Sequence, residues 1–154
     1  MSGLSWAEFV ASDMAFAEAG ARLLFGAEGA AVAYLATADA EGTPHVGPVC
    51  PVFSRGRLYL VAAGGTPKVQ DLRTGGAFAL HAPLGERDEE FQLGGRAREV
   101  VDQSERAAVQ ADIPFPSWNP ADPIFELRVG RALHVVWEGH GEAAMQRLSK
   151  RWPR

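Results

Sequence analysis

The sequence predicts a mainly β protein in which six antiparallel strands form a closed or nearly closed barrel, accompanied by short helices. Three observations support this fold class. Six apolar segments are separated by turn residues, helical spacing is confined to short segments, and several of the connections are very short. Short connections join antiparallel neighbours, and closure of the sheet removes exposed strand edges.

Length and composition indicate one soluble domain. The chain has 154 residues, of which 47% are apolar, and this is enough to build one core. We therefore treat 1–154 as a single domain, with an N-terminal helical segment at 1–27 and a C-terminal tail at 138–154. The formal net charge of -4 argues against a nucleic-acid surface. No apolar run approaches the roughly 20 residues that span a bilayer, so no membrane partner is expected.

The cysteine and histidine content gives two further expectations. Cys50 is the only cysteine, and the first residues lack a basic leader followed by an apolar block, so a cytoplasmic location is expected. The histidines fall on separate predicted elements without ligand spacing, so no metal site is expected: His45, His81, His134 and His140.

The N-terminal part is predicted to be helical and the next part to form strands. Ser5 and Glu8 have capping-box spacing, which predicts a helix over 5–25 that Gly20 divides in two. Strands are predicted at 31–37, 45–53 and 57–63. Pro48 and Pro51 cannot donate to a central ladder, so the second strand is predicted to be bulged or to lie at an edge.

The remaining segments complete the barrel. A short helix is predicted at 67–73, strands at 77–82 and 90–100, and a helix from Asp102 to Ala111. A proline-rich irregular run at 113–123 precedes one long strand at 124–139, bent at Gly130. The basic tail after it is predicted to be helical.

The stretch "LYLVAAGGTPKVQDL" (58–72) suggests a phosphate site. A strand is followed by a glycine turn, Thr66 suits the N-cap, and Pro67 suits the first helical position. Lys68 adds a cation to a helix end that is already positive, which is typical of anion binding. The alternative is an ordinary strand-to-helix connection. Because the side chains offer no complete catalytic set, a bound cofactor is expected to carry any chemistry.

The order of these elements resembles the FMN-binding split-barrel family related to pyridoxamine 5'-phosphate oxidase. The resemblance covers about residues 28–137. It rests on "AYLATADAEGTPHVGPVCPVF", "GRLYLVAAGGTPKVQDLR" and "FQLGGRAREV", taken in order. It implies a split β-barrel of the FMN-binding type and a homodimer with flavin at the interface.

The resemblance also implies site residues. Thr66 and Lys68 correspond to phosphate contacts, while Pro67 stands where the family usually has arginine. His45 stands where the oxidases often have arginine, and Glu90 stands where they carry a flavin-contacting glutamine. The implied cofactor-contacting set is His45, Val46, Gly47, Pro48, Val49, Cys50, Val61, Thr66, Pro67, Lys68 and Glu90. Arg147 and Leu148 match loosely an Arg-Leu pair that the oxidases use for substrate.

Two tryptophans are additional candidates. Trp118, in the proline-rich run, or Trp152, in the tail, is a candidate to cover the flavin ring, with the partner subunit's ring as one possibility. The alternative for Trp118 and its neighbour Phe115 is that they plug one end of the barrel.

The resemblance implies a flavin-dependent oxidoreductase that acts on an unidentified small molecule. Two alternatives remain open. One is a deazaflavin-dependent reductase, and the other is a non-enzymatic flavin- or haem-binding protein. Catalytic residues are not assigned.

Overall fold

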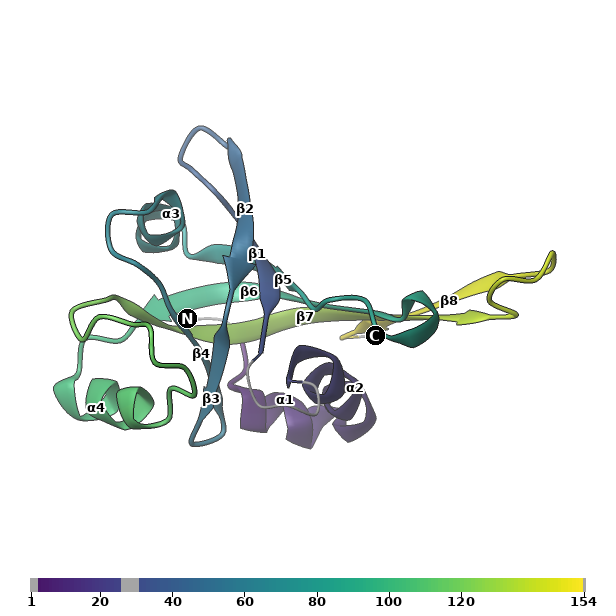
Figure 1. The fold of residues 1–154 in the computed structure, drawn as a ribbon, viewed down its shortest axis with the longest axis horizontal. Helices are drawn as coiled ribbons and strands as arrows, with labels where there is room; N and C mark the ends of the chain where they lie inside the picture. The colour runs from purple at the N-terminus through teal and green to yellow at the C-terminus, as the bar shows by residue number, and fades with distance from the viewer. Residues whose placement is uncertain (1–2, 26–30, 154) are drawn as a thin grey trace.

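The structure is a computed structural model that describes residues 3–25 and 31–153. These residues form one antiparallel sheet of eight strands, with four α-helices and one short 3-10 helix, η1 (Glu86–Asp88) (Figure 1). The predicted fold class, a mainly β antiparallel split barrel, is confirmed. The predicted number of six strands is too low.

The sheet curls so that its two ends are consecutive in the chain. Its strand order is β2-β1-β5-β6-β7-β4-β3, and β8 pairs with β7 off this path. The strands of the path are β2 (Pro44–Val49), β1 (Ala33–Ala38), β5 (Ala77–His81), β6 (Glu90–Glu99), β7 (Ile124–Glu138), β4 (Arg57–Val61) and β3 (Pro51–Ser54). Only Cys50 separates β2 from β3, so the chain itself connects the two ends of the path.

The predicted strand at 45–53 is therefore two strands. β2 pairs with β1, and β3 pairs with β4, so the chain changes its pairing partner at Cys50. Pro48 and Pro51 lie on the two terminal strands of the sheet path, which confirms the prediction of an edge position. A proline there leaves no central ladder bond unmade.

The predicted helix in the basic tail is wrong. The tail forms β8 (Gln146–Trp152), which pairs with β7 from Ala132 to Glu138. This half of β7 lies beyond the reach of β4, which pairs only with Ile124 to Glu126. Without β8, the edge of β7 would expose unpaired backbone groups. The β7–β8 hairpin extends away from the body of the molecule (Figure 1).

The N-terminal helices break at Asp13 rather than at Gly20. α1 (Trp6–Ser12) begins with the predicted capping box, and α2 (Met14–Phe25) follows directly. The Asp13 carboxylate accepts a hydrogen bond from the Phe16 amide at 3.1 Å and so caps α2. Gly20 lies within α2, where an added Cβ would be 2.4 Å from the Phe91 ring.

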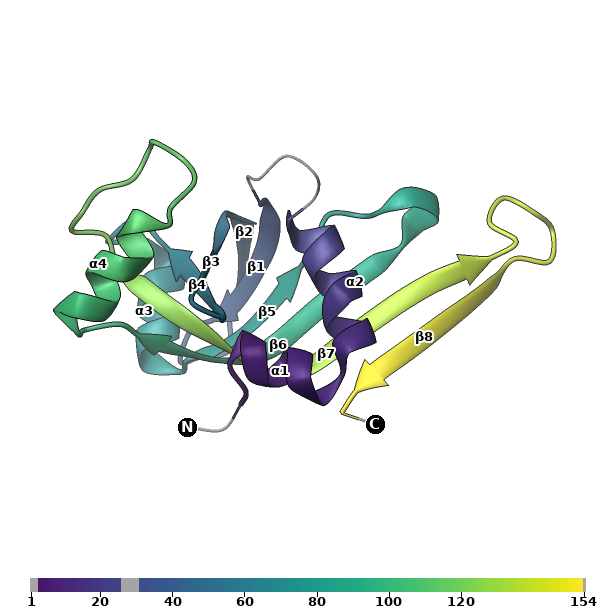
Figure 2. The same cartoon turned by 90° about the horizontal axis from the view of Figure 1, so that it is seen from below.

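The helices cover different parts of the sheet. α1 and α2 contact β4, β6 and β7 around the main core cluster (Figure 2). α4 (Gln103–Ala111) contacts β3 above a smaller cluster that includes Tyr59 and Ile124. α3 (Pro67–Thr74) contacts β1, β5 and β6. Figure 1 shows α3 and β2 on the opposite side of β6 and β7 from α1 and α2.

No helix within the described ranges combines the length and the apolar character that crossing a membrane requires.

Candidate functional site

The start of α3 presents backbone N–H groups that no protein acceptor occupies. Gly65 has φ +78, a conformation that glycine adopts without strain. Thr66 occupies the N-cap position, but its hydroxyl donates to the Ala63 carbonyl oxygen at 2.8 Å and does not cap an amide of α3. Among residues 3–25 and 31–153, no acceptor pairs with the amides of Gly65, Thr66 and Lys68. These donors are available to an anion.

Lys68 adds a positive charge to this helix end. Its side chain is half-buried, and in the described part of the chain no carboxylate lies within 4.0 Å of its ammonium group. Three residues further along α3 is Asp71, a spacing that places both side chains on the same face of the helix. A cation without a partner at a positive helix end indicates a site for a negatively charged ligand.

A buried carboxylate connects α3 to the barrel strands. Asp71 is only 3% exposed. Its Oδ2 accepts a hydrogen bond from the Thr37 hydroxyl at 2.6 Å and lies 2.8 Å from Nδ1 of His45. An ionised carboxylate can only accept, so Nδ1 of His45 carries a proton and Nε2 is left for another contact. The His45 side chain is 37% exposed, so a ligand can reach it.

The predicted contact residues on β2 do not share one face. His45, Gly47 and Val49 lie opposite the buried β1 residues, and Val46 and Pro48 point to the other face. An added Cβ at Gly47 would meet no atom within 4 Å. The strand therefore leaves open space beside His45, where an extended ligand could lie along the backbone.

Val61 lies near the same end of the sheet. The antiparallel register of β3 and β4 pairs Pro51 with Leu60. Continued by one residue, this register places Cys50 beside Val61. The chain then runs from Val61 through the glycine turn into α3, whose Asp71 contacts His45 of β2.

The structure does not bring Glu90 to α3 within one chain. The carboxylate of Glu90 lies 3.8 Å from the Arg147 guanidinium. The part of β6 beside the end of α3 is Ala97, whose amide donates to the Gly76 carbonyl oxygen. Glu90 is seven residues from Ala97 and is therefore roughly 23 Å away along the extended strand.

Of the two tryptophans, Trp152 lies apart from α3. Trp152 packs edge-on against Phe9 of α1, with ring centroids 4.8 Å apart. Trp118 is half-buried in the segment before β7, while its neighbour Phe115 packs on the smaller core cluster. The segment of Trp118 reaches the glycine turn before α3, since the Gly64 amide donates to the Asp122 carboxylate at 3.4 Å.

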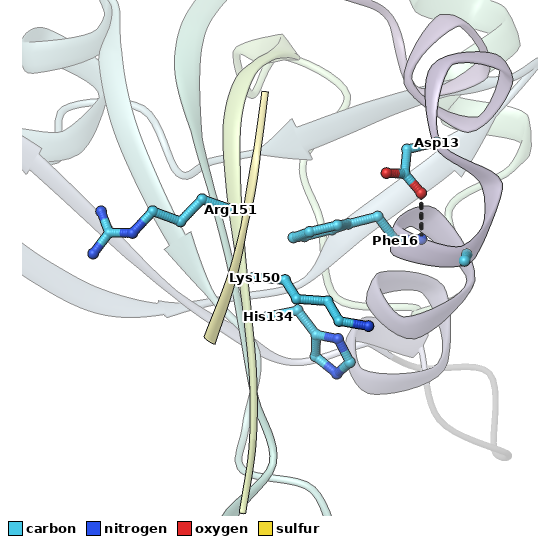
Figure 3. Close-up of a pocket in the computed structure, with 6 residues that line it drawn as sticks. Asp13, Phe16, His134, Lys150 and Arg151 are labelled. Atoms are coloured by element: carbon cyan, nitrogen blue, oxygen red, sulfur yellow. Dashed lines mark hydrogen bonds between the residues drawn. The ribbon is translucent and has the colours of Figure 1, made fainter. Parts of the chain in front are cut away.

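A second hollow, of about 460 Å³, lies between α2 and the β7–β8 hairpin. Figure 3 shows Lys150 and His134 on one side of the hairpin and Arg151 on the other. Two of its polar groups are already engaged: Asp13 caps α2, and His134 Nε2 lies 2.7 Å from Glu89. The lining residues are Asp13, Ala15, Phe16, His134, Lys150 and Arg151. The unengaged donors are His45 on β2 and the residues Gly65, Thr66 and Lys68 at the start of α3. These residues form the β2–α3 junction, which is the stronger candidate site.

The described ranges contain no group of three or more histidine, cysteine, aspartate or glutamate side chains placed to hold a metal ion.

The sequence profile of the pyridoxamine 5'-phosphate oxidase family matches residues 25–135. The chain belongs to this family. The matched range contains all of β1 to β6 together with α3 and α4, and therefore the whole β2–α3 junction. No curated protein matches the sequence closely enough to count as a relative.

Solved structures in and around the pyridoxamine 5'-phosphate oxidase family share the fold. A NimC/NimA family protein from Clostridium acetobutylicum is 14% identical, with 94% of each chain covered and a TM-score of 0.61. PhzG from Burkholderia lata 383, in complex with tetrahydrophenazine-1-carboxylic acid, is 14% identical over 92% of this chain and 84% of its own, with a TM-score of 0.58. A heme binding protein from Mycobacterium smegmatis is 21% identical over 84% of this chain, with a TM-score of 0.56, and this chain spans 57% of its length.

The donors at the β2–α3 junction fit a phosphorylated cofactor. Free amides, the Lys68 ammonium and the exposed edge of His45 supply positive charge and N–H groups, and Gly47 leaves room along β2. Pro67, at the position of the family's usual arginine, supplies no donor. Sequence reasoning missed Asp71, which holds the ring of His45 in place.

Proposed function

We propose that the protein binds FMN with its phosphate at the β2–α3 junction and uses it in an oxidoreductase reaction on a small molecule. The observation that carries this proposal is the set of unpaired donors at the start of α3, in a chain of the pyridoxamine 5'-phosphate oxidase family. When bound, the flavin supplies a ring nitrogen that accepts or donates hydride.

The residues of the chain would bind and orient the cofactor. The Lys68 ammonium and the amides of Gly65 and Thr66 would hold the phosphate, and His45 would replace the arginine missing at position 67. The inner face of β2, open at Gly47, would carry the ribityl chain and the ring past Val49 toward Cys50 and Val61. Glu90 and Trp152 would reach the flavin only from a second subunit, whereas Trp118 lies in a segment that meets the turn before α3 in the same chain.

Haem binding is a second candidate function, favoured by one observation. An imidazole that donates Nδ1–H to a carboxylate and leaves Nε2 free has the arrangement of many metal-ligating histidines. His45 could therefore ligate a haem iron, and the Mycobacterium smegmatis protein of the same fold is named as a heme binding protein. The absorption spectrum of the purified protein separates the two candidates.

Replacing Lys68 with alanine is expected to weaken FMN binding by roughly ten- to a hundred-fold, because a charge-assisted contact to the phosphate is lost. The measurement is a titration of the cofactor-free protein with FMN. Arg73→Ala is the matched control: it removes a cation from the other end of α3, where Arg73 pairs with Glu99 at 2.7 Å. Equal FMN affinity in the wild type and in folded Lys68→Ala protein would exclude this phosphate site.

We further propose a homodimer formed through the outer face of β1 and β2. Three large apolar side chains are exposed there: Val32 is 46%, Tyr34 50% and Val46 76% exposed. The pairings Tyr34 with Pro48 and Ala36 with Val46 place them in one apolar patch beside the edge strand β2. Contiguous exposed apolar surface of this kind is typical of protein interfaces.

Val46→Asp is expected to convert the dimer to monomers at low micromolar concentration, because it places a charge within the apolar patch. Sedimentation velocity measures the change. Val101→Asp is the control, since Val101 is equally exposed, at 77%, but lies between β6 and α4. A Val46→Asp protein that stays dimeric would place the interface elsewhere. A monomeric wild type that binds FMN would contradict a flavin site that is shared between two subunits.

A further inference from the structure

We propose that Asp71 is a positioning residue that makes His45 a phosphate donor and thereby makes the site select FMN over riboflavin. This inference rests on the proposed function. It concerns Asp71, a buried carboxylate that is not among the groups proposed to hold the phosphate directly.

The first step is the geometry of the pair. Asp71 Oδ2 lies 2.8 Å from Nδ1 of His45, and the Thr37 hydroxyl donates to the same oxygen at 2.6 Å. Asp71 is 3% exposed and extends from α3, whereas His45 extends from β2. A buried acceptor fixed by two donors determines how the imidazole ring is oriented, so Nε2 is the only ring nitrogen left for a ligand.

The second step is the protonation that a phosphate requires. With Nδ1–H directed at Asp71, Nε2 can hydrogen-bond an ionised phosphate oxygen only if Nε2 also carries a proton, because two lone pairs with no hydrogen between them repel each other. The ring must then be an imidazolium between two anions. Asp71 compensates its charge from one side, and the phosphate does so from the other.

The charged groups around the ring are few. On α3 the charged group at the ring is Asp71. In the β1–β2 turn it is Asp39, whose carboxyl has a lowered pKa chiefly because of the Thr43 amide hydrogen bond and, to a lesser extent, because of His45. Thr37, on β1, is the neutral neighbour. A phosphate at Nε2 requires a second proton on the ring, so FMN binding should be accompanied by proton uptake wherever the free ring carries only the Nδ1 proton.

Riboflavin has the same ring and ribityl chain but no phosphate. The contribution of the Asp71–His45 pair should therefore be present in the FMN affinity and absent from the riboflavin affinity. The ratio of the two affinities isolates this contribution from any general change in stability or in the shape of the ring site.

Asp71→Asn, which keeps the size of the side chain, is expected to lower the FMN-to-riboflavin affinity ratio by roughly ten-fold or more, with riboflavin binding unchanged. His45→Gln should lower it equally. Because Asp71 acts through His45, Asp71→Asn should have no further effect in the His45→Gln background. Glu99→Gln is the matched control: it removes the charge of a carboxylate that pairs with Arg73 of α3 and does not contact His45, and it should leave the ratio within about two-fold.

Calorimetry of the wild type in buffers of different ionisation enthalpy supplies a test that needs no variant. Proton uptake with FMN and none with riboflavin supports the inference. Three results would overturn the inference while leaving the FMN site intact. They are an unchanged FMN-to-riboflavin affinity ratio in folded Asp71→Asn protein, independent effects of the Asp71 and His45 substitutions, and equal proton uptake for the two ligands. A wild type that binds neither flavin would overturn both the inference and the proposed function.

Discussion

Gly95→Ala is expected to lower the free energy of unfolding by about 3 kcal/mol or more. Gly95 lies at a shift of register between β6 and β7, where the two strands approach closely. An added Cβ would be 1.9 Å from the Arg128 carbonyl oxygen and 3.0 Å from the Gly130 nitrogen. Both atoms belong to the backbone, so a side-chain rotation cannot relieve the contact, and the longest strand pairing of the barrel must shift.

Chemical denaturation of the cofactor-free protein measures this loss. Gly47→Ala is the control, because Gly47 is also a strand glycine but an added Cβ there meets no atom within 4 Å. Its effect should stay within about 0.5 kcal/mol. A Gly95→Ala protein as stable as the Gly47→Ala protein would show that the close approach of β6 and β7 is not required.

Glu126→Ala is expected to cost about 3–5 kcal/mol, because Glu126 is the fully buried centre of an arginine cluster. Its carboxylate accepts from Arg98 at 2.7 and 2.9 Å and lies 3.3 Å from both Arg57 and Arg128. Removing it would leave three guanidinium groups close together without their common partner. The arginines are partly exposed and can be hydrated, which favours the lower end of the range.

Neighbouring groups reinforce this cluster. The Tyr59 hydroxyl donates to Glu105 at 2.9 Å, and burial raises the pKa of Tyr59 to about 12, with this hydrogen bond as the second cause. Hydrogen bonds from Arg98 lower the pKa of Glu105. Thermal and denaturant unfolding of Glu126→Ala measure the effect.

Glu99→Gln is the comparison for Glu126→Ala. It disrupts the exposed pair with Arg73 and should cost less than about 1 kcal/mol. Equal losses for the two variants would mean that burial of the Glu126 charge adds nothing to stability.

Local signals predicted most of the fold because they act over a few residues. The capping box at Ser5 and Glu8, the Pro67 start of α3 and the Asp102 cap of α4 all form as expected. Gly20 was misassigned because helix propensity penalises glycine, whereas here its missing side chain admits the Phe91 ring.

The tail shows the limit of local signals more clearly. Its composition suits a helix, but the unpaired edge of β7 and the contact of Trp152 with Phe9 favour a strand. Neither is visible in the sequence of the tail. Tertiary pairing determined the structure of this segment.

The part of the candidate site whose residues are adjacent in the chain could be predicted from the sequence. Thr66 and Lys68 were found because a glycine turn and a helix start adjoin in sequence. Asp71 was missed because its partners, Thr37 and His45, are 34 and 26 residues away, and only the fold brings them together. Side chains alternate between the two faces of β2, so the predicted continuous run from His45 to Cys50 contains residues of both faces.

The most direct test of the account is the identity of the cofactor in the purified protein. Absorption spectroscopy of the native protein, followed by mass spectrometry of the small molecules released by denaturation, gives the answer. A flavin spectrum and the mass of FMN, in a ratio near unity to the chain, are the expected results. A haem absorption band, the mass of a deazaflavin, or a protein that neither contains nor takes up FMN would contradict the proposed function.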